Sequence, residues 1–363
     1  MRKVLAFDLE ITRPLPSGDM DAAPFVGISC CAAKLSDVPH PVVWYAGQGP
    51  QSQFEDWPLP AEMDAGQLAE VADFLLLHAS QGYEIVTWNG LGFDYKVLAR
   101  GIGDPDRSAA LAKLALTQYD PGFVQVCQAG YMAKLVGVAQ GLGVGSKTAG
   151  MHGALAPVLW SNVWPETLDE EGEAALRADI EGLALAPGSR AAQDLVLEYV
   201  ANDVDITLAS YMALCQRRSV NWITARGRPS RRPWLPKLKR GAQGVRFWSP
   251  AEALHLQEPN TSWMDSPPRP REEYYKWTVA ALGVAQWRAI VGIEPIYHGP
   301  RNAPAPNPEP VAAKDSQEDD SWPGPRPGVQ PTAPARGQVS GDERPRIVGR
   351  QDGEWPTEPP PGF

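Results

Sequence analysis

Residues 4–11 read VLAFDLEI, and this stretch decides the fold that the sequence predicts. Successive side chains of a β-strand point to opposite faces of the sheet, so Phe7 and Leu9 share one face while Asp8 and Glu10 share the other. The apolar residues indicate a buried first strand. Its other face carries two carboxylates, about 7 Å apart along the chain, for which a metal site and a solvated strand face are the alternatives.

Further strand and helix patterns follow the first strand along the chain. Two strand-like runs come directly after it and could complete a three-stranded meander, and later strands alternate with helices. This order predicts an α/β fold in which a mixed sheet is flanked by helices. The expected later strands cover residues 25–33, 41–46 and 83–88, and the expected helices cover residues 64–79, 93–100, 109–116, 131–142 and 191–215.

Composition divides the rest of the chain into two further regions. Residues 217–246 hold ten Lys or Arg and no Asp or Glu, with Trp222 and Trp234 between them. The last 64 residues contain 15 of the 37 prolines and few aliphatic side chains, a composition typical of disorder. We therefore expect an α/β domain over residues 1–216, a basic, Trp-containing extension over residues 217–298 and a Pro-rich disordered tail over residues 299–363.

The net charge and the cysteine content of the chain exclude several classes of protein. A net charge of -10 excludes a surface coated in basic residues, so any contact with nucleic acid must come from a local patch. The four cysteines show no CxxC spacing, which fits neither a zinc site nor a disulfide framework and favours a reducing cytoplasm. No run of about 18 apolar residues could span a bilayer, and the first residues are too charged for a signal peptide. We expect a soluble cytoplasmic protein without a membrane partner.

Three acidic motifs occur in an order that suggests a catalytic set. Asp8 and Glu10 offer the carboxylate oxygens that Mg²⁺ and Mn²⁺ prefer. Asp94 follows a glycine turn and opens a predicted helix, where an ordinary helix cap is the alternative. Tyr199 and Asp203 share one helix face, where a core tyrosine with a hydrogen-bond partner is the alternative. Each motif alone has an ordinary structural explanation, and the conjunction is more specific than its parts.

The order DxE, NGxxFD and YxxxD resembles the DEDD superfamily of 3'-5' exonucleases over residues 4–215. The tyrosine subclass matches, because the histidine subclass has His where this chain has Glu198. The resemblance implies a ribonuclease H-like fold and a reaction that uses two Mg²⁺ or Mn²⁺ ions. It implies that four carboxylates bind the ions and that the catalytic residues are Asp8, Glu10, Asp94, Tyr199 and Asp203.

A second likeness concerns residues 141–160, which read GLGVGSKTAGMHGALAPVLW. They are similar to a segment of phage and bacterial proteins related to the proofreading exonuclease domain of family B DNA polymerases. The segment also nearly spells the phosphate-binding loop of NTPases, but Ser146 stands where that motif requires Gly, and a predicted helix precedes it in place of a strand. Lys147 is expected to meet a phosphate of a nucleic-acid substrate, with an ordinary solvated lysine as the alternative.

These likenesses imply an enzyme that hydrolyses phosphodiester bonds at 3' ends, with single-stranded DNA as the expected substrate and RNA as the alternative. A catalytically idle ribonuclease H-like module that binds nucleic acid and a structure-specific endonuclease on the same fold are competing hypotheses. A tyrosine with an ordinary pKa of about 10 is a poor base at neutral pH, so Tyr199 is expected to orient the attacking water. The Pro-rich tail is a candidate contact for a replication partner.

Side chains that could hold the nucleic acid lie in the turn before Asp94 and in the basic region. Asn89 could contact the substrate backbone, although Asn also favours turns for its own sake. Basic residues could clamp phosphates while Trp222 or Trp234 stacks on a base, with a solvated linker as the alternative. The predicted substrate-binding residues are Asn89, Lys147, Arg226, Arg228 and Trp234.

Overall fold

The computed structural model describes the chain between residues 2 and 296, with gaps. The described ranges are 2–15, 26–48, 57–166, 168–217, 219–224, 227–233, 239–241, 244–262, 264 and 268–296. Arg226, Trp234 and the tail over residues 299–363, which the composition predicts to be disordered, lie outside the described residues.

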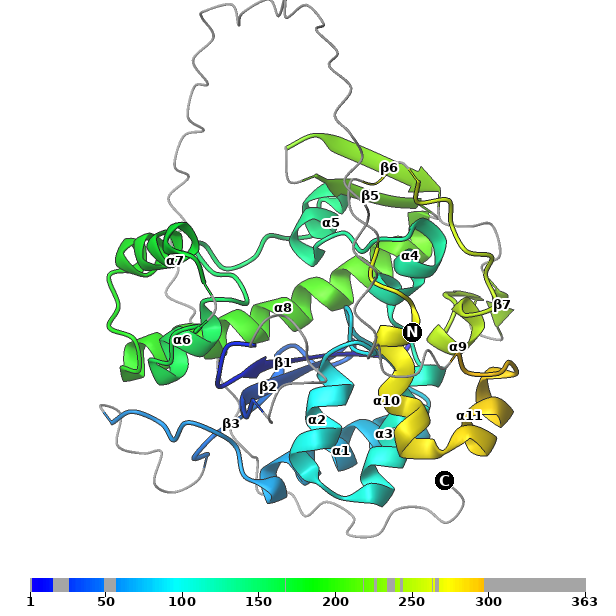
Figure 1. The fold of residues 1–363 in the computed structure, drawn as a ribbon, viewed down its shortest axis with the longest axis horizontal. Coiled ribbons are helices and arrows are strands. Elements are labelled where there is room, and N and C mark those ends of the chain that lie inside the picture. The colour runs from blue at the N-terminus through cyan, green and yellow to red at the C-terminus, as the bar shows by residue number, and fades with distance from the viewer. Residues whose placement is uncertain are drawn as a thin grey trace, which may run out of the picture. The chain divides into compact units, whose positions relative to one another are not determined.

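A four-stranded mixed sheet carries the residues of the first motif (Figure 1). Its strands are β1 (Val4–Ile11), β2 (Ile28–Leu35), β3 (Val42–Tyr45) and β4 (Glu84–Val86), in the order β3-β2-β1-β4. The first three strands form the predicted antiparallel meander, and β4 runs parallel to β1. Because helices cover both faces of the sheet, nearly all residues of β1 are buried.

Helices flank this sheet on both faces. Figure 1 shows α8 (Arg190–Arg217) on one face and α1, α2 and α3 on the other. On the second face, the rings of Phe7 and Tyr95 lie 6.1 Å apart between centroids. The predicted mixed α/β architecture is confirmed, and the ribonuclease H-like assignment stays a prediction. The other helices up to α8 are α1 (Ala65–Ser80), α2 (Asp94–Ile102), α3 (Pro105–Thr117), α4 (Pro121–Ala129), α5 (Leu135–Leu142), α6 (Ala156–Ser161) and α7 (Glu170–Leu183).

Aspartate caps explain where several of these helices begin. Asp64, Asp104 and Asp169 accept hydrogen bonds from backbone N–H groups in the first turns of α1, α3 and α7, and Asp120 does the same for α4. Such a cap satisfies donors that have no partner within the helix. Helix α2 differs, because Phe93 precedes it and offers no side-chain cap. The start of α2 therefore depends on other contacts.

Part of the basic region forms a β-hairpin of β5 (Ser219–Ile223) and β6 (Pro229–Pro233). Trp222 on β5 is only 6% exposed and packs into the hydrophobic core, so of the two tryptophans considered for stacking on a base this one does not present its ring to solvent. Helix α5 approaches β5 closely. A Cβ atom at Gly141 would lie 2.5 Å from the carbonyl oxygen of Asn221, so this contact requires Gly.

The later elements of the described residues are a small hairpin and three helices. The hairpin is formed by β7 (Lys239–Gly241) and β8 (Gly244–Arg246). The helices α9 (Pro250–Ala253), α10 (Glu272–Leu282) and α11 (Val284–Val291) pack against α3. The Nε1 atom of Trp277 on α10 donates to the carbonyl of Leu91 at 2.7 Å. Buried aromatic residues of α10 and α11 belong to the same hydrophobic core as β1. Residues on both sides of the predicted domain boundary at residue 216 therefore contribute to one core.

Among the helices in these ranges, none combines the length and the apolar composition needed to cross a membrane.

Candidate metal centre

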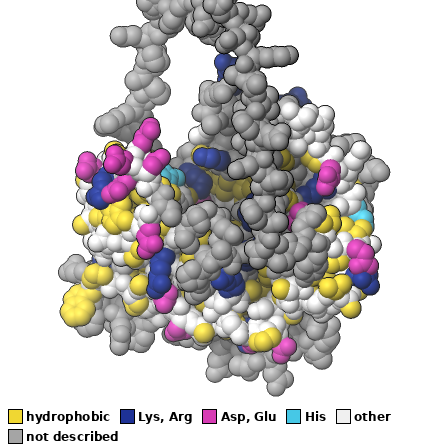
Figure 2. All heavy atoms as spheres, in the orientation of Figure 1, with side chains coloured by type: hydrophobic (Ala, Val, Ile, Leu, Met, Phe, Trp, Pro, Cys, Tyr) yellow, Lys and Arg dark blue, Asp and Glu magenta, His cyan; other side chains and the backbone are white. Residues whose placement is uncertain are grey.

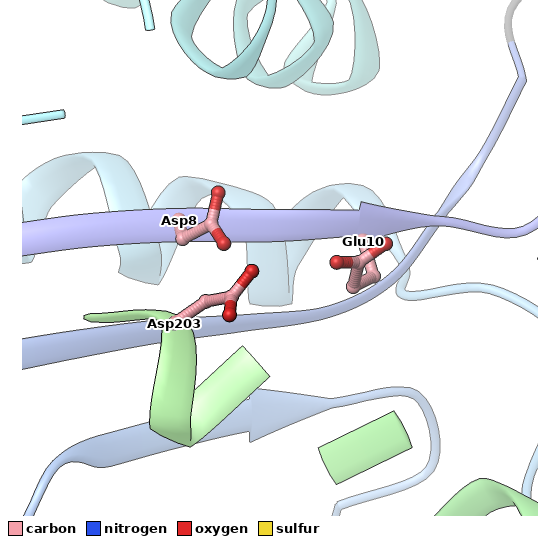
Figure 3. A group of neighbouring side chains, drawn as sticks. All are labelled: Asp8, Glu10 and Asp203. Atoms are coloured by element: carbon pink, nitrogen blue, oxygen red, sulfur yellow. The ribbon is translucent and has the colours of Figure 1, made fainter. Parts of the chain in front are cut away.

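Three carboxylates from two elements converge on one face of the sheet. Asp8 and Glu10 belong to β1, and Asp203 belongs to α8, which packs across that strand (Figure 3). One ligand oxygen from each residue lies within 4.8 Å of the other two. A single cation could contact all three side chains, so the group is a candidate metal centre.

Strand and helix periodicity explain why these side chains meet. The two acidic residues of β1 are two positions apart, so they face the same side of the sheet, and α8 covers that side. Tyr199 lies one helical turn before Asp203 on the same face and is 1% exposed. The side chain of Asp205 is 48% exposed and forms an ion pair with Lys34 at 3.3 Å. Asp203 therefore joins the cluster and Asp205 does not.

Asp94 lies beside Asp8 but outside this group of three. Strand β4 pairs only with residues 4–6 of β1, so the N–H of Leu9 extends past the last paired residue of β4. That N–H donates to Oδ1 of Asp94 at 3.2 Å, in place of a bond to a neighbouring strand. Asp94 is buried, and its carboxyl group, when protonated, donates a hydrogen bond to Asp8. The first residue of α2 is thus held at the edge of the cluster.

Lys147 brings a positive charge to the carboxylates. Its Nζ atom forms an ion pair with Oδ2 of Asp203 and donates to the Tyr199 hydroxyl at 2.6 Å. The loop that carries it is tied to α8, because the side chain of Asn202 donates to the carbonyl of Ser146 at 3.1 Å. Lys147 therefore pairs with a candidate metal ligand. The phosphate contact that the sequence predicts for it stays a prediction.

Burial and mutual repulsion raise the pKa values of the clustered carboxyls. Burial, together with the nearby charge of Asp203, raises the pKa of Asp8 to about 7. Burial and the charge of Asp8 raise the pKa of Glu10 well above its usual range, and they do the same for Asp94. The charge of Lys147 opposes these shifts at Asp8 and Glu10. A divalent cation would offset the repulsion and favour the ionised forms.

The donor set suits a hard divalent cation. All three side chains offer carboxylate oxygens, which Mg²⁺ and Mn²⁺ prefer, whereas zinc sites are rich in His and Cys. The Oδ1 atom of Asp203 is buried and has no hydrogen-bond partner within the described part of the chain. A buried polar atom without a partner costs about 1–3 kcal/mol, and a cation would supply the missing interaction. The residues thus fit the ions that the motifs predict.

Neither family models, nor curated proteins, nor solved structures significantly match this chain. The case for a function therefore rests on the geometry of the cluster and on the three sequence motifs.

The residues predicted to bind substrate have different surroundings. Asn89 adopts a left-handed backbone conformation with φ 74°, and its Oδ1 atom is buried without a hydrogen-bond partner among the described residues. Arg228 is exposed in the connection between β5 and β6. Arg226 and Trp234 lie outside the described residues. Contact of these side chains with nucleic acid stays a prediction.

Asp120 is a buried acidic residue that the motifs did not indicate. Its carboxylate accepts hydrogen bonds from the backbone N–H groups of Asn89 and Leu91, in the turn that leads to Asp94. A sequence signal does exist, because Asp followed by Pro121 is typical of a helix start. That signal predicts a cap on α4 and says nothing of the distant turn.

Proposed function

We propose that the chain is a metal-dependent exonuclease that removes nucleotides from the 3' ends of nucleic acid. The observation that carries the proposal is the convergence of Asp8, Glu10 and Asp203, whose ligand oxygens lie within 4.8 Å of one another. Enzymes that cleave phosphodiester bonds with two divalent ions need such oxygen ligands. The 3' polarity, the preference for single-stranded DNA and the ribonuclease H-like fold come from the resemblance of the three motifs to the tyrosine subclass of DEDD exonucleases.

Asp8, Glu10, Asp94 and Asp203 would together hold two Mg²⁺ or Mn²⁺ ions. Activation of a water for attack on phosphorus and stabilisation of charge on the leaving 3' oxygen are the chemistry that such ions supply when bound. Four carboxylates bring the negative charge that two divalent cations require. Burial of Glu10, Asp94 and Asp203 strengthens every electrostatic interaction at this site, because the local dielectric constant is lower than that of water.

Tyr199 is suited to orient a reacting group and not to deprotonate it. Burial and the neighbouring charges of Glu10 and Asp203 raise the pKa of Tyr199 far above its ordinary value. The hydroxyl therefore keeps its proton at neutral pH. Because Lys147 donates to the hydroxyl oxygen at 2.6 Å, the hydroxyl hydrogen is left for the carboxylate side, where it is donated to Asp203. A water or a phosphate oxygen held there could compete with Asp203 for this hydrogen.

Surface charge favours one direction of approach for a polyanion. Helix α7, which precedes α8, exposes acidic side chains, and Figure 2 shows acidic atoms gathered over that part of the surface. The β5–β6 hairpin, which follows α8, exposes Arg228 and Arg231. Phosphates are repelled by the first surface and attracted by the second. We infer that a single strand reaches the cluster from the side of the hairpin.

The test is a nuclease assay of the purified chain with Mg²⁺ or Mn²⁺ on 5'-labelled single-stranded DNA and RNA. A ladder that shortens from the 3' end is expected, and a chelator should abolish it. Asp203→Asn should slow cleavage by more than about 100-fold, since even the outer partners of metal ligands cost about 10- to 100-fold. The matched control is Asp205→Asn, on the same helix but exposed, which should retain cleavage.

Two other outcomes separate the competing functions. Absence of cleavage with either metal would contradict the proposal and favour a binding module without catalysis. Cleavage of circular single-stranded DNA, which has no 3' end, would identify an endonuclease instead.

A further inference from the structure

Asp120 lies at the edge of the sheet where the chain leaves β4. Tyr119 forms an isolated parallel bridge with Val86, the last residue of β4, and Thr87 donates to the carbonyl of Tyr119 at 3.1 Å. Two segments therefore leave the sheet side by side. One continues into the turn that leads to Asp94, and the other continues into Asp120 and α4.

The carboxylate of Asp120 joins these two segments. Its Oδ1 atom accepts from the N–H of Asn89 at 2.9 Å and from the N–H of Phe123 at 3.0 Å. Its Oδ2 atom accepts from the N–H of Leu91 at 3.0 Å. Only the bond to Phe123 caps α4. The other two bonds hold a turn that is about 30 residues away in the sequence.

The turn needs this support for two reasons. Asn89 has φ 74°, a left-handed conformation that residues other than glycine adopt at a cost in free energy. Helix α2 begins directly after the turn, and Phe93 supplies no side-chain cap for it. The carbonyl of Asn89 accepts from the N–H of Phe93 at 2.9 Å, so the position of Asn89 is passed on to the start of α2.

We infer that Asp120 is a positioning residue for the candidate metal centre, because it fixes the turn that sets Asp94 beside Asp8. The inference rests on the proposed function for its catalytic consequence. The competing explanation is that Asp120 only caps α4.

Asp120→Asn separates these two roles. Asn caps helices about as well as Asp, so a capping role survives the substitution. An Asn side chain has a single acceptor oxygen, and its amide group would face either Leu91 N–H or the N–H groups of Asn89 and Phe123. In either orientation, the amide N–H group of the introduced Asn would face the backbone N–H of Asn89 or of Leu91. Two donors would then face each other in the turn, and one of its two hydrogen bonds to residue 120 would be lost. The matched control is Asp169→Asn, which changes the cap of α7 without contact to the turn.

The experiment measures kcat and KM on 5'-labelled single-stranded DNA with Mn²⁺, and amide hydrogen exchange, in the full chain. Asp120→Asn should lower kcat by about 10- to 100-fold, as loss of groups that orient metal ligands does, while KM changes less than about threefold. Exchange at Asn89 and Leu91 should quicken by about tenfold or more. Asp169→Asn should change none of these quantities. Asp120→Ser, which also caps a helix, should behave as Asp120→Asn does and replaces it if that variant does not fold.

The inference would be overturned if amide exchange in the turn were as slow in Asp120→Asn as in the wild type. It would also be overturned if Asp120→Asn had the kcat of the wild type. Failure of the proposed function would be seen separately, as a wild-type chain that cleaves nothing. In that case the exchange rates alone decide whether Asp120 positions the turn.

Discussion

At the scale of single residues, the ion pair between Lys147 and Asp203 joins a loop to the candidate metal centre. The charge of Lys147 also opposes the raised pKa values of Asp8 and Glu10. A divalent cation among these carboxylates would compete with the lysine for Asp203 and would be repelled by it. Lys147 is therefore expected to limit the affinity of the cluster for metal ions.

We predict that Lys147→Met binds Mn²⁺ about tenfold more tightly than the wild type, a difference of about 1.4 kcal/mol. The substitution keeps the apolar stem of the side chain and removes its charge. Calorimetric titration with Mn²⁺ measures the affinity without dependence on activity. Lys34→Met is the control, because Lys34 pairs with Asp205 outside the cluster. Unchanged or weaker binding in Lys147→Met would show that the lysine and the ion do not compete.

Single residues also show how far the sequence predicts the site. Strand alternation places Asp8 and Glu10 on one face, and helical spacing places Tyr199 beside Asp203, so local periodicity is enough for these residues. Lys147 stands 56 residues before its partner, in a loop without periodicity. The ion pair of Lys147 with Asp203 forms only in the folded chain, so no local sequence pattern predicts it. The bonds from Asp120 to a distant turn have the same cause.

At the scale of elements, the buried face of a helix decides whether its pattern is visible in the sequence. Helix α8 has a broad apolar stripe, and the predicted range of residues 191–215 lies within the observed Arg190–Arg217. Helix α7 buries only two of its residues, Leu176 and Ile180. Its sequence therefore has no apolar stripe from which the helix could be predicted. Helix α5 begins at Leu135, later than the predicted residue 131, because Lys134 is extended and not helical.

The β5–β6 hairpin, which exposes Arg228 and Arg231, gives a testable prediction about nucleic-acid binding. Each phosphate contact on a single strand contributes about -0.7 to the slope of log affinity against log salt. Replacing Arg228 and Arg231 together with Ser should weaken binding of single-stranded DNA at low salt and flatten the slope by about 1.4. Fluorescence anisotropy with a labelled oligonucleotide and chelated metal measures both quantities across a salt series.

The control for the hairpin removes the same charge elsewhere. Arg177 on α7 and Arg288 on α11 are exposed, and their joint replacement with Ser should leave the slope close to the wild-type value. An equal slope in the hairpin variant and the wild type would exclude Arg228 and Arg231 from the binding surface.

At the scale of the whole molecule, the crowded carboxyls couple folding to pH. An unfolded Asp has a pKa of about 3.9, whereas burial and Asp203 raise that of Asp8 to about 7 in the folded chain. The folded chain therefore binds this proton more tightly than the unfolded chain. The contribution to stability is full below the unfolded pKa and is lost as the pH rises through about 7. Glu10 shifts in the same direction.

With divalent ions chelated, we predict that the Tm advantage of Asp8→Asn over the wild type grows between about pH 5 and about pH 8. The reason is that Asn cannot ionise, so the variant escapes the repulsion that the wild type acquires. Thermal unfolding followed by circular dichroism at both pH values measures the difference. Adding Mn²⁺ at the higher pH should stabilise the wild type more than the variant. A difference in Tm that shrinks as the pH rises would show that Asp8 is not protonated in the folded chain.

The most direct test of a divalent-metal centre at Asp8, Glu10 and Asp203 is a crystal structure with Mn²⁺ and its anomalous difference map. The predicted result is a peak at about 2.0–2.4 Å from an oxygen of each of the three residues, with Lys147 displaced from Asp203. A map with no peak at these carboxylates, at a Mn²⁺ concentration that saturates binding in solution, would contradict the proposed metal centre and the nuclease reaction that depends on it.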